Sequence, residues 1–236
     1  GPLVPGNIHV AQPTQYRCNQ CSREGTCNLD CARDVERTII HEGPSTVAAF
    51  IAEPISAAAG IHVPHPEYWP MIREICDRHG VILIADEVIT GFGRTGKMFA
   101  MEHWGVKPDI TTVAKGLTSG YVPIGAAITS GKIADAFIGE GDTTFQHLIT
   151  FGGNPVSSAA ALANLDIMEN ENMVAHSADM GDYLYERLQT LRKHTIVGDV
   201  RGGKGLLCAL ELVKDRKTGE AFPKELKLDK LAVRVM

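Results

Sequence analysis

The sequence predicts an α/β protein with a mostly parallel sheet in residues 1–168 and the start of a small α+β domain in residues 169–236. Two observations predict the sheet: short apolar runs alternate with segments of helical apolar spacing, and those runs are rich in aliphatic residues, as in buried parallel strands. A third predicts the smaller domain, because two long helical stretches lead into a second, separate pair of apolar runs.

Each expected element follows from the local apolar pattern and from the Gly and Pro residues at its ends. An irregular segment rich in Pro, Gly, Asn, Gln and Cys fills residues 1–33. Gly43-Pro44 ends the first expected helix, Gly80 ends the second, and Pro155 suits the first turn of the fourth. We expect helices over 34–41, 66–79, 98–104, 156–168 and 174–193, and buried strands over 47–52, 81–85, 110–114 and 125–129. The strands of the smaller domain are expected over 197–200 and 206–213.

Composition excludes several classes of protein. Of 236 residues, 44% are hydrophobic and 22% charged, which is typical of a globular chain. Lys and Arg number 23 against 28 Asp and Glu, a net charge of −5, and the positive residues are scattered, which argues against nucleic-acid binding. Apolar runs such as 81–85 are far shorter than the roughly 18 residues of a membrane span. We therefore expect a cytoplasmic protein with no nucleic-acid or membrane partner.

Four cysteines crowd one segment: Cys18, Cys21, Cys27 and Cys31. Four thiolates can close a tetrahedral zinc site, but the second pair lacks the two-residue spacing of a zinc knuckle. Reduced thiols in a cytosolic loop are the favoured interpretation, with structural metal as the alternative. No metal is expected.

Three apolar runs end in a charged residue: Glu53, Asp86 and Lys115. In open α/β sheets, ligands bind at the carboxyl ends of strands. A lysine at the end of a buried strand is expected to be poorly solvated, which favours the neutral amine, a nucleophile toward carbonyls. A lysine Schiff base with an aspartate at the ring nitrogen is the protein's part of pyridoxal-phosphate chemistry. A lysine that only pairs with a carboxylate is the alternative.

The run Gly91-Phe92-Gly93-Arg94-Thr95-Gly96 matches the dinucleotide-binding pattern G-x-G-x-x-G. The surrounding sequence does not fit this function. A dinucleotide-binding motif follows the first strand directly, opens a long helix and precedes an acidic residue by about 20 positions. We interpret these glycines as a loop beside the site, with dinucleotide binding as the alternative.

The segment from Thr150 to Pro155 precedes an expected helix. Backbone N–H groups at a helix start can hold a phosphate, and the Thr150 hydroxyl could add a further contact. An N-capped turn explains the same residues equally well.

Three ordered motifs resemble the class III pyridoxal-phosphate-dependent aminotransferases, which have the fold of type I pyridoxal-phosphate enzymes. They are DEVITGFGRTG at 86–96, TTVAKGLTSGYVPIGA at 111–126 and TFGGNPVSSAAALANLDIM at 150–168. Segments at 2–10, 53–60 and 200–213 are also similar, so the resemblance covers nearly the whole chain. The cysteine-bearing segment resembles a loop of the omega-amino-acid:pyruvate and taurine:pyruvate branch, which argues further against metal.

The resemblance implies a role for each site residue. Lys115 forms the Schiff base with pyridoxal 5′-phosphate and then shifts protons as a general acid and base. Asp86 pairs with the pyridinium nitrogen, and Val88 packs against the ring. Glu53 is similar to the glutamate near the substrate carboxylate. Thr150 resembles the residue that reaches across a homodimer interface to the partner's cofactor phosphate. The implied reaction moves an amino group from an amine or omega-amino acid to a keto acid such as pyruvate.

Departures from the family pattern bear on activity. Ile89 stands where many relatives have a glutamine that contacts the ring hydroxyl. The amino-terminal phosphate loop, the ring-stacking aromatic residue and a carboxyl-terminal substrate arginine have no counterpart in these 236 residues. A sheet lacking several strands would leave apolar faces and edges uncovered. We expect the sequence to be part of a longer product with little activity alone. The alternatives are a non-catalytic or metal-binding fragment, or an aminomutase or decarboxylase, since fold does not fix reaction.

Overall fold

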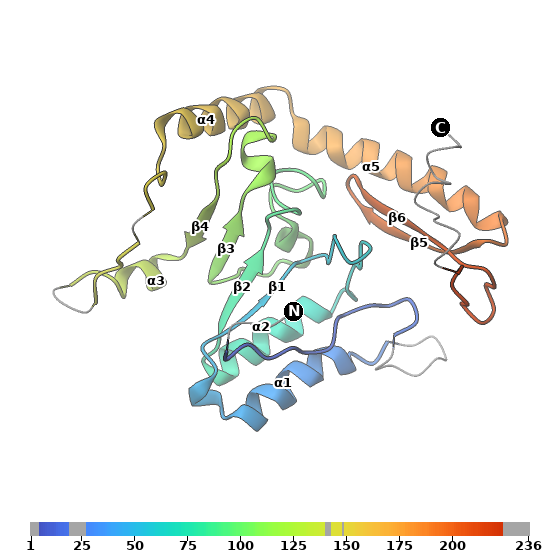
Figure 1. Cartoon of the computed structure of the whole chain (residues 1–236), viewed down its shortest axis with the longest axis horizontal. Helices are drawn as coiled ribbons and strands as arrows, with labels where there is room; N and C mark the ends of the chain where they lie inside the picture. Colours follow the sequence, from blue (N-terminus) through green and yellow to red (C-terminus); the bar gives the residue numbers. More distant parts are fainter. Residues whose placement is uncertain (1–4, 19–26, 140–142, 148, 224–236) are drawn as a thin grey trace.

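The four-stranded sheet of the larger unit is mostly parallel, as predicted. The computed structural model describes residues 5–18, 27–139, 143–147 and 149–223 (Figure 1). The strands lie in the order β1 (Ala49–Ala52), β2 (Ile82–Asp86), β3 (Ile110–Val113) and β4 (Ala126–Thr129). The first three run parallel to one another, and β4 is antiparallel to β3.

Two helices build the main core against this sheet. They are α1 (Asp30–Glu42) and α2 (Tyr68–His79), and both lie along the β1–β2 part of the sheet in Figure 1. Trp69 and Ile72 of α2 pack with Leu83 of β2 in one buried cluster that also contains residues of α1. The Trp69 indole nitrogen donates to the Pro54 carbonyl over 3.0 Å, so the helix also fixes the segment that follows β1.

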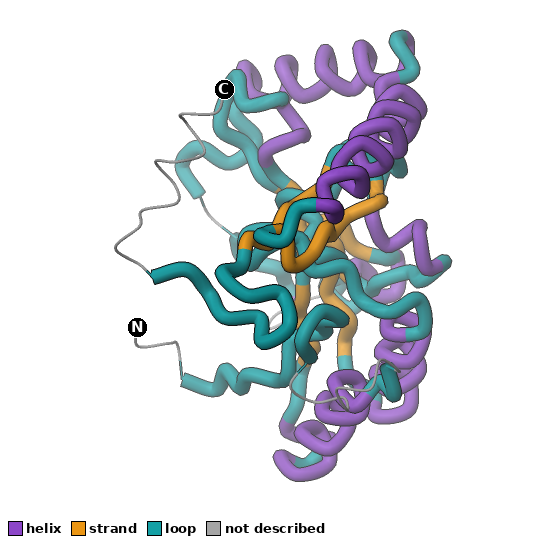
Figure 2. Tube along the Cα trace, turned by 90° about the vertical axis from the view of Figure 1, so that its right-hand side faces the viewer, coloured by secondary structure: helices purple, strands orange, loops and turns teal. Residues whose placement is uncertain are grey.

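The carboxyl-terminal part has two long helices and its own small sheet. Helix α4 (Pro155–Asn170) is followed by α5 (Met173–Gln189), and β5 (Val197–Lys204) pairs antiparallel with β6 (Leu207–Leu212). Short helices complete the fold: η1 (Pro44–Thr46), η2 (Ala100–Trp104), η3 (Lys115–Thr118), α3 (Gly131–Asp135) and η5 (Thr190–Lys193). In the orthogonal view the helices lie mainly to one side of the strands and the loops to the other (Figure 2).

Sequence periodicity located the elements well, with three corrections. Helix α1 begins at Asp30, inside the segment expected to be irregular, and β5 extends to Lys204 rather than ending at Val200. The expected burial of the strand at 125–129 is wrong, because every residue of β4 is exposed. Among the described strands, β4 forms an edge of the sheet and pairs only with β3.

Apolar surface is left uncovered, as expected for an incomplete sheet. Ile51 on β1 and Ile128 on β4 are 59% and 47% exposed. Val156 and Leu162 on α4 are exposed as well. Apolar surface of this kind marks contacts with further protein. No helix of the described ranges combines the length and the apolar character that a membrane crossing needs.

Candidate active site

The residues that follow the three parallel strands gather at one edge of the sheet. Ala52 pairs with Ala85, so Glu53 comes next to the end of β2, where Asp86 lies. Asp86 pairs with Thr112, and Lys115 follows β3 as the first residue of η3. The pairing of β1 with β2 and of β2 with β3 brings the carboxyl ends of these parallel strands to one edge of the sheet, which is why three residues distant in sequence lie along it.

Asp86 is a half-buried carboxylate whose orientation is fixed. Its Oδ1 atom accepts a hydrogen bond from the Val88 backbone N–H over 3.1 Å and another from the Thr112 hydroxyl over 3.2 Å. Among the described residues, no hydrogen bond uses the second oxygen, Oδ2. The carboxylate therefore keeps one oxygen available for a cationic donor such as a protonated ring nitrogen.

Lys115 has an unusual backbone. Its φ is +35°, a left-handed conformation that costs a residue other than glycine about 1–3 kcal/mol. The expectation of a poorly solvated amine is wrong for this chain, because Lys115 is exposed. The physical reason is that packing buries only Leu117 and Thr118 of η3, at the far end of the turn, and among the described residues it leaves the Lys115 side chain in contact with water.

The glycine-rich loop lies beside the Lys115 turn, as interpreted from the sequence. A Cβ atom added to Gly116 would stand 3.1 Å from the Phe92 Cβ and 3.5 Å from the Gly91 carbonyl oxygen. This contact explains why glycine follows the lysine, since any side chain would push the loop away.

The same glycines are packed against protein, which contradicts the dinucleotide alternative. A Cβ on Gly93 would lie 3.3 Å from a Val174 methyl group, and one on Gly96 would lie 2.8 Å from the Ala178 Cβ. A Cβ on Gly205, in the β5–β6 turn, would lie 2.5 Å from the Gly96 backbone nitrogen. These glycines allow α5 and the hairpin to approach the loop, so they cannot also cradle a pyrophosphate.

Glu53 is held by the loop that it precedes. Its Oε2 atom accepts the Ala57 N–H over 3.1 Å, and the Ala57 carbonyl in turn accepts the Gly60 N–H. Arg201 of β5 donates to the Gly60 carbonyl over 2.7 Å and pairs with Glu211 at 2.6 Å. A guanidinium of the smaller sheet thus ties down the loop that orients Glu53, a link absent from the sequence pattern.

Thr150 is exposed in the loop before α4. The N-capped turn is present: Asn154 Oδ1 accepts the N–H groups of Val156 and Ser157 at 3.0 and 3.2 Å. The cap occupies donors that a helix-terminus phosphate site would need, so the hydroxyl of Thr150 is the remaining candidate for such a contact.

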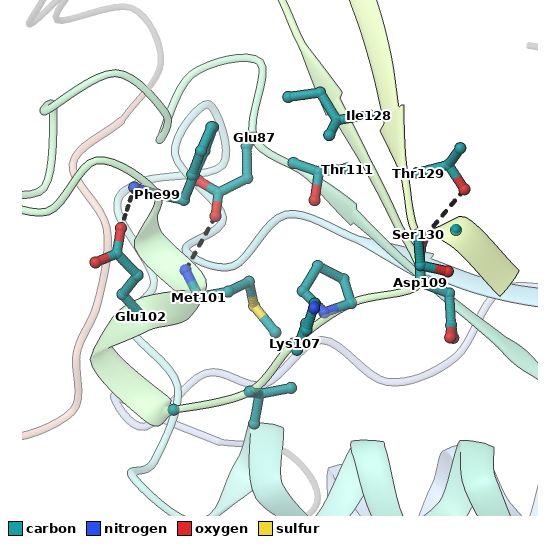
Figure 3. Close-up of a pocket in the computed structure, with 14 residues that line it drawn as sticks. Glu87, Phe99, Met101, Glu102, Lys107, Asp109, Thr111, Ile128, Thr129 and Ser130 are labelled. Atoms are coloured by element: carbon teal, nitrogen blue, oxygen red, sulfur yellow. Dashed lines mark hydrogen bonds between the residues drawn. The ribbon is translucent and has the colours of Figure 1, made fainter. Parts of the chain in front are cut away.

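Glu87 is an important residue that the sequence interpretation missed. It is 1% exposed, and its carboxylate accepts the Thr90 hydroxyl and the N–H groups of Ala100 and Met101, at 2.6 to 2.9 Å. Figure 3 shows it directed at the start of η2. Burial raises the pKa of this carboxyl group. Burial alternates along β2 and continues to position 87, but residues 81–85 are all apolar, so the sequence itself carried no period of two that could have located Glu87.

A cavity of about 680 Å³ lies at the other end of β3 from Lys115. Its lining includes Glu87, Phe99, Asp109, Ile128 and Ser130 (Figure 3). None of the residues predicted to bind cofactor or substrate lines it. The cavity is therefore distinct from the candidate active site.

The cysteines give no support to a metal centre. Cys21 lies outside the described residues, so the four-cysteine alternative cannot be assembled here. Across the described ranges, no group of three or more His, Cys, Asp or Glu residues is arranged to hold a metal ion. Cys76 is fully buried in α2, and burial raises the pKa of its thiol to about 11.

The fold and the strand-end residues define an α/β protein of the type that binds pyridoxal phosphate through a lysine. Residues 1–234 match the family described as aminotransferase class-III, and the chain belongs to that family. The taurine–pyruvate aminotransferase of Bilophila wadsworthia is 44% identical over 227 residues, or 93% of this chain and 49% of the relative. The putrescine–pyruvate aminotransferase of Pseudomonas aeruginosa is 42% identical, over 93% of this chain and 48% of that one.

Solved structures agree with this assignment. An amine transaminase from an uncultivated Pseudomonas species, in its PLP-bound form, superposes with a TM-score of 0.90 at 44% identity. The match covers 96% of this chain and 52% of that one. An (S)-enantioselective omega-transaminase from Thermomicrobium roseum gives 0.89 at 45% identity, over 97% and 51%. The fold is that of the type I pyridoxal-phosphate enzymes, and the chain spans about half the length of the relatives it matches.

Proposed function

We propose that this chain supplies the lysine-bearing half of a class III aminotransferase. The reaction transfers an amino group from an amine or omega-amino acid to a keto acid such as pyruvate. The observation that carries the proposal is the shared sheet edge, where Asp86 ends β2 and Lys115 follows the neighbouring strand. Relatives that act on taurine or putrescine with pyruvate support the substrate classes.

The residues at this edge fit pyridoxal 5′-phosphate. The free oxygen of Asp86 suits a pyridinium nitrogen, and Val88 is half-buried in the turn directly after it, where an apolar face for the ring is needed. Lys115 supplies a primary amine one strand away. Bound pyridoxal phosphate supplies an electron-withdrawing ring that stabilises negative charge on the substrate carbon.

The chain's own residues then have distinct tasks. Lys115 Nζ would hold the cofactor covalently, and its amine would accept a proton and return it as a general base and acid. Asp86 keeps the ring nitrogen protonated by its negative charge. Glu53, fixed by the Ala57 N–H, orients the end of the substrate remote from the amino group.

Assembly and location are further parts of the proposal. Thr150 is exposed in the turn before α4, which suits a contact with the cofactor phosphate of a partner subunit in a homodimer. A domain boundary near residue 168 is supported by the separate two-stranded sheet beyond α5. A cytoplasmic location fits the absence of a membrane-spanning helix in the described ranges.

Covalent labelling tests the proposal directly. Incubation with pyridoxal phosphate followed by borohydride should fix the cofactor on the peptide that contains Lys115, as found by mass spectrometry. The variant Lys115→Ala should lose this label. Lys132→Ala is the matched control, because Lys132 is an exposed lysine of α3, which follows the antiparallel strand β4 and not one of the three parallel strands, and it should keep the label. Equal labelling of all exposed lysines would contradict the proposal.

The reaction type needs a second measurement. With amino donor alone, a transaminase bleaches the cofactor absorbance and releases a keto product without carbon dioxide. Carbon dioxide release would indicate a decarboxylase, and an isomeric amino acid would indicate an aminomutase. A colourless protein with stoichiometric zinc would indicate a non-catalytic, metal-binding fragment.

A further inference from the structure

Helix α4 presents one face to the turn that carries Lys115. Ala161 and Leu165 on this face pack with Val113 and Leu117 in a small apolar cluster. Asn164 lies between them on the helix, since residues three and four apart share a face. A polar amide in such an apolar contact needs hydrogen-bond partners.

All the polar atoms of the Asn164 amide are used by the turn. Its Nδ2 donates to the Gly116 carbonyl over 3.0 Å and to the Leu117 carbonyl over 3.1 Å. Its Oδ1 accepts the Ser119 hydroxyl over 2.6 Å. The amide orientation follows from these partners, because a flipped amide would set its oxygen against two carbonyl oxygens.

These bonds hold a segment that has two residues in the left-handed backbone region. Lys115 has a left-handed backbone, and Ser119, at the other end of the turn, has a φ of +48°. Strained residues persist only where the surroundings fix them. Phe92 packs against Gly116 from the glycine-rich loop, so the turn is held from two sides, and only Asn164 provides side-chain hydrogen bonds to its carbonyls among the described residues.

We propose that Asn164 is a positioning residue for the Lys115 amine. It acts through the two carbonyls and the hydroxyl of the turn and does not touch the cofactor. The inference rests on the proposed function for the role of Lys115. The three hydrogen bonds between Asn164 and the turn, here called the clamp, are present in this chain whatever that role is.

The clamp is tested by hydrogen exchange on the full 236-residue chain. The reporters are the N–H groups of Leu117, Ser119 and Tyr121, which donate within the turn. Asn164→Leu keeps the side-chain size and removes the hydrogen bonds, and it should raise their exchange by about tenfold or more. Amides of β1 and β2 should keep their rates. Asn170→Leu is the matched control, because Asn170 is exposed on the same helix.

A milder variant checks that the faster exchange does not come from a general loss of the fold. Ser119→Ala removes only the contact to Oδ1 and leaves both Nδ2 donors in place, so its effect should be smaller than that of Asn164→Leu. If the three reporter N–H groups exchange at the wild-type rate in Asn164→Leu, the clamp does not hold the turn and the inference is wrong.

The positioning role is tested by the rate of cofactor labelling. Borohydride trapping of pyridoxal phosphate at Lys115 should slow by about tenfold in Asn164→Leu, with labelling of Lys132 unchanged as an internal reference. Faster exchange with an unchanged Lys115 rate would overturn the positioning role. Absence of Lys115 labelling in the unsubstituted chain would instead contradict the proposed function, and the exchange rates would still decide whether the clamp exists.

Discussion

The Thr112 hydroxyl donates a hydrogen bond to Asp86 Oδ1 over 3.2 Å, from one parallel strand to its neighbour. The two residues are register partners at the carboxyl ends of β2 and β3. The Val88 N–H donates to the same oxygen, so the aspartate is held by one donor from the next strand and one from its own turn. These two bonds fix the carboxylate and leave Oδ2 without a hydrogen bond among the described residues.

This arrangement predicts graded losses of cofactor affinity. Asp86→Asn removes the negative charge and should weaken pyridoxal-phosphate binding by about 10- to 100-fold. Thr112→Val keeps the shape of the side chain and removes one donor, and it should weaken binding by about three- to tenfold. Fluorescence titration measures both. Stronger loss in Thr112→Val than in Asp86→Asn would contradict the assigned roles.

Glu87 predicts a particular dependence of stability on pH. Its pKa is raised by burial above the value of 4.5 that the unfolded chain keeps, so the native state holds the proton to higher pH. Its contribution to the free energy of unfolding is therefore full below pH 4.5 and is lost as pH rises through the native pKa. Position 87 cannot ionise in Glu87→Gln, so only the wild type loses this contribution. The free energy of unfolding of the wild type minus that of the variant should therefore fall as pH rises.

Urea titrations at a series of pH values measure this difference. Glu169→Gln is the control, since Glu169 is exposed on α4 and is not among the groups that shift the pKa of Glu87, so this variant should keep the pH profile of the wild type. A difference that widens with rising pH would show that Glu87 is stabilised as the anion.

The glycine-rich loop predicts a contrast between two glycine substitutions. Gly96 has a φ of +77° and lies against Ala178, so Gly96→Ala should lower the free energy of unfolding by about 2–4 kcal/mol. Gly80, with a φ of +68°, has nothing within 4 Å of an added Cβ. Gly80→Ala should therefore cost only about 1–2 kcal/mol of backbone strain. Chemical denaturation measures both, and equal losses would mean that packing at Gly96 is unimportant.

The buried thiol of Cys76 should be inert. With a pKa of about 11, only about one thiol in a thousand is ionised at pH 8. Iodoacetamide should leave Cys76 unmodified in the folded chain and modify it in urea, as read by peptide mass spectrometry. Half-buried Cys208 provides the comparison within the same sample. Rapid modification of Cys76 under native conditions would show that α2 opens readily.

The 236-residue chain alone should show little or no transaminase activity. Lys115 is exposed, and exposed apolar side chains lie on both edge strands and on α4. Water around the amine weakens the electrostatic control that the reaction needs. Pyruvate-dependent amino transfer by the purified chain, followed by chromatography of the products, checks this, and measurable turnover would prove it wrong.

The sequence by itself determined the order of strands and helices along the chain and the positions of the polar residues at the strand ends. Apolar periodicity and turn residues are local signals, so Asp86, Lys115 and the helix start at Pro155 could be located without coordinates. Family motifs then gave those positions their predicted roles.

Only the tertiary structure decided which distant groups hold them. Asn164 is 48 residues from Gly116, and Arg201 is 141 residues from Gly60, so neither contact leaves a periodic trace in the chain. Solvent exposure of Lys115 and β4 was likewise beyond local pattern, because burial depends on which segments close over a strand. An apolar run records that a strand can be buried, and only the packing of the whole molecule determines whether it is.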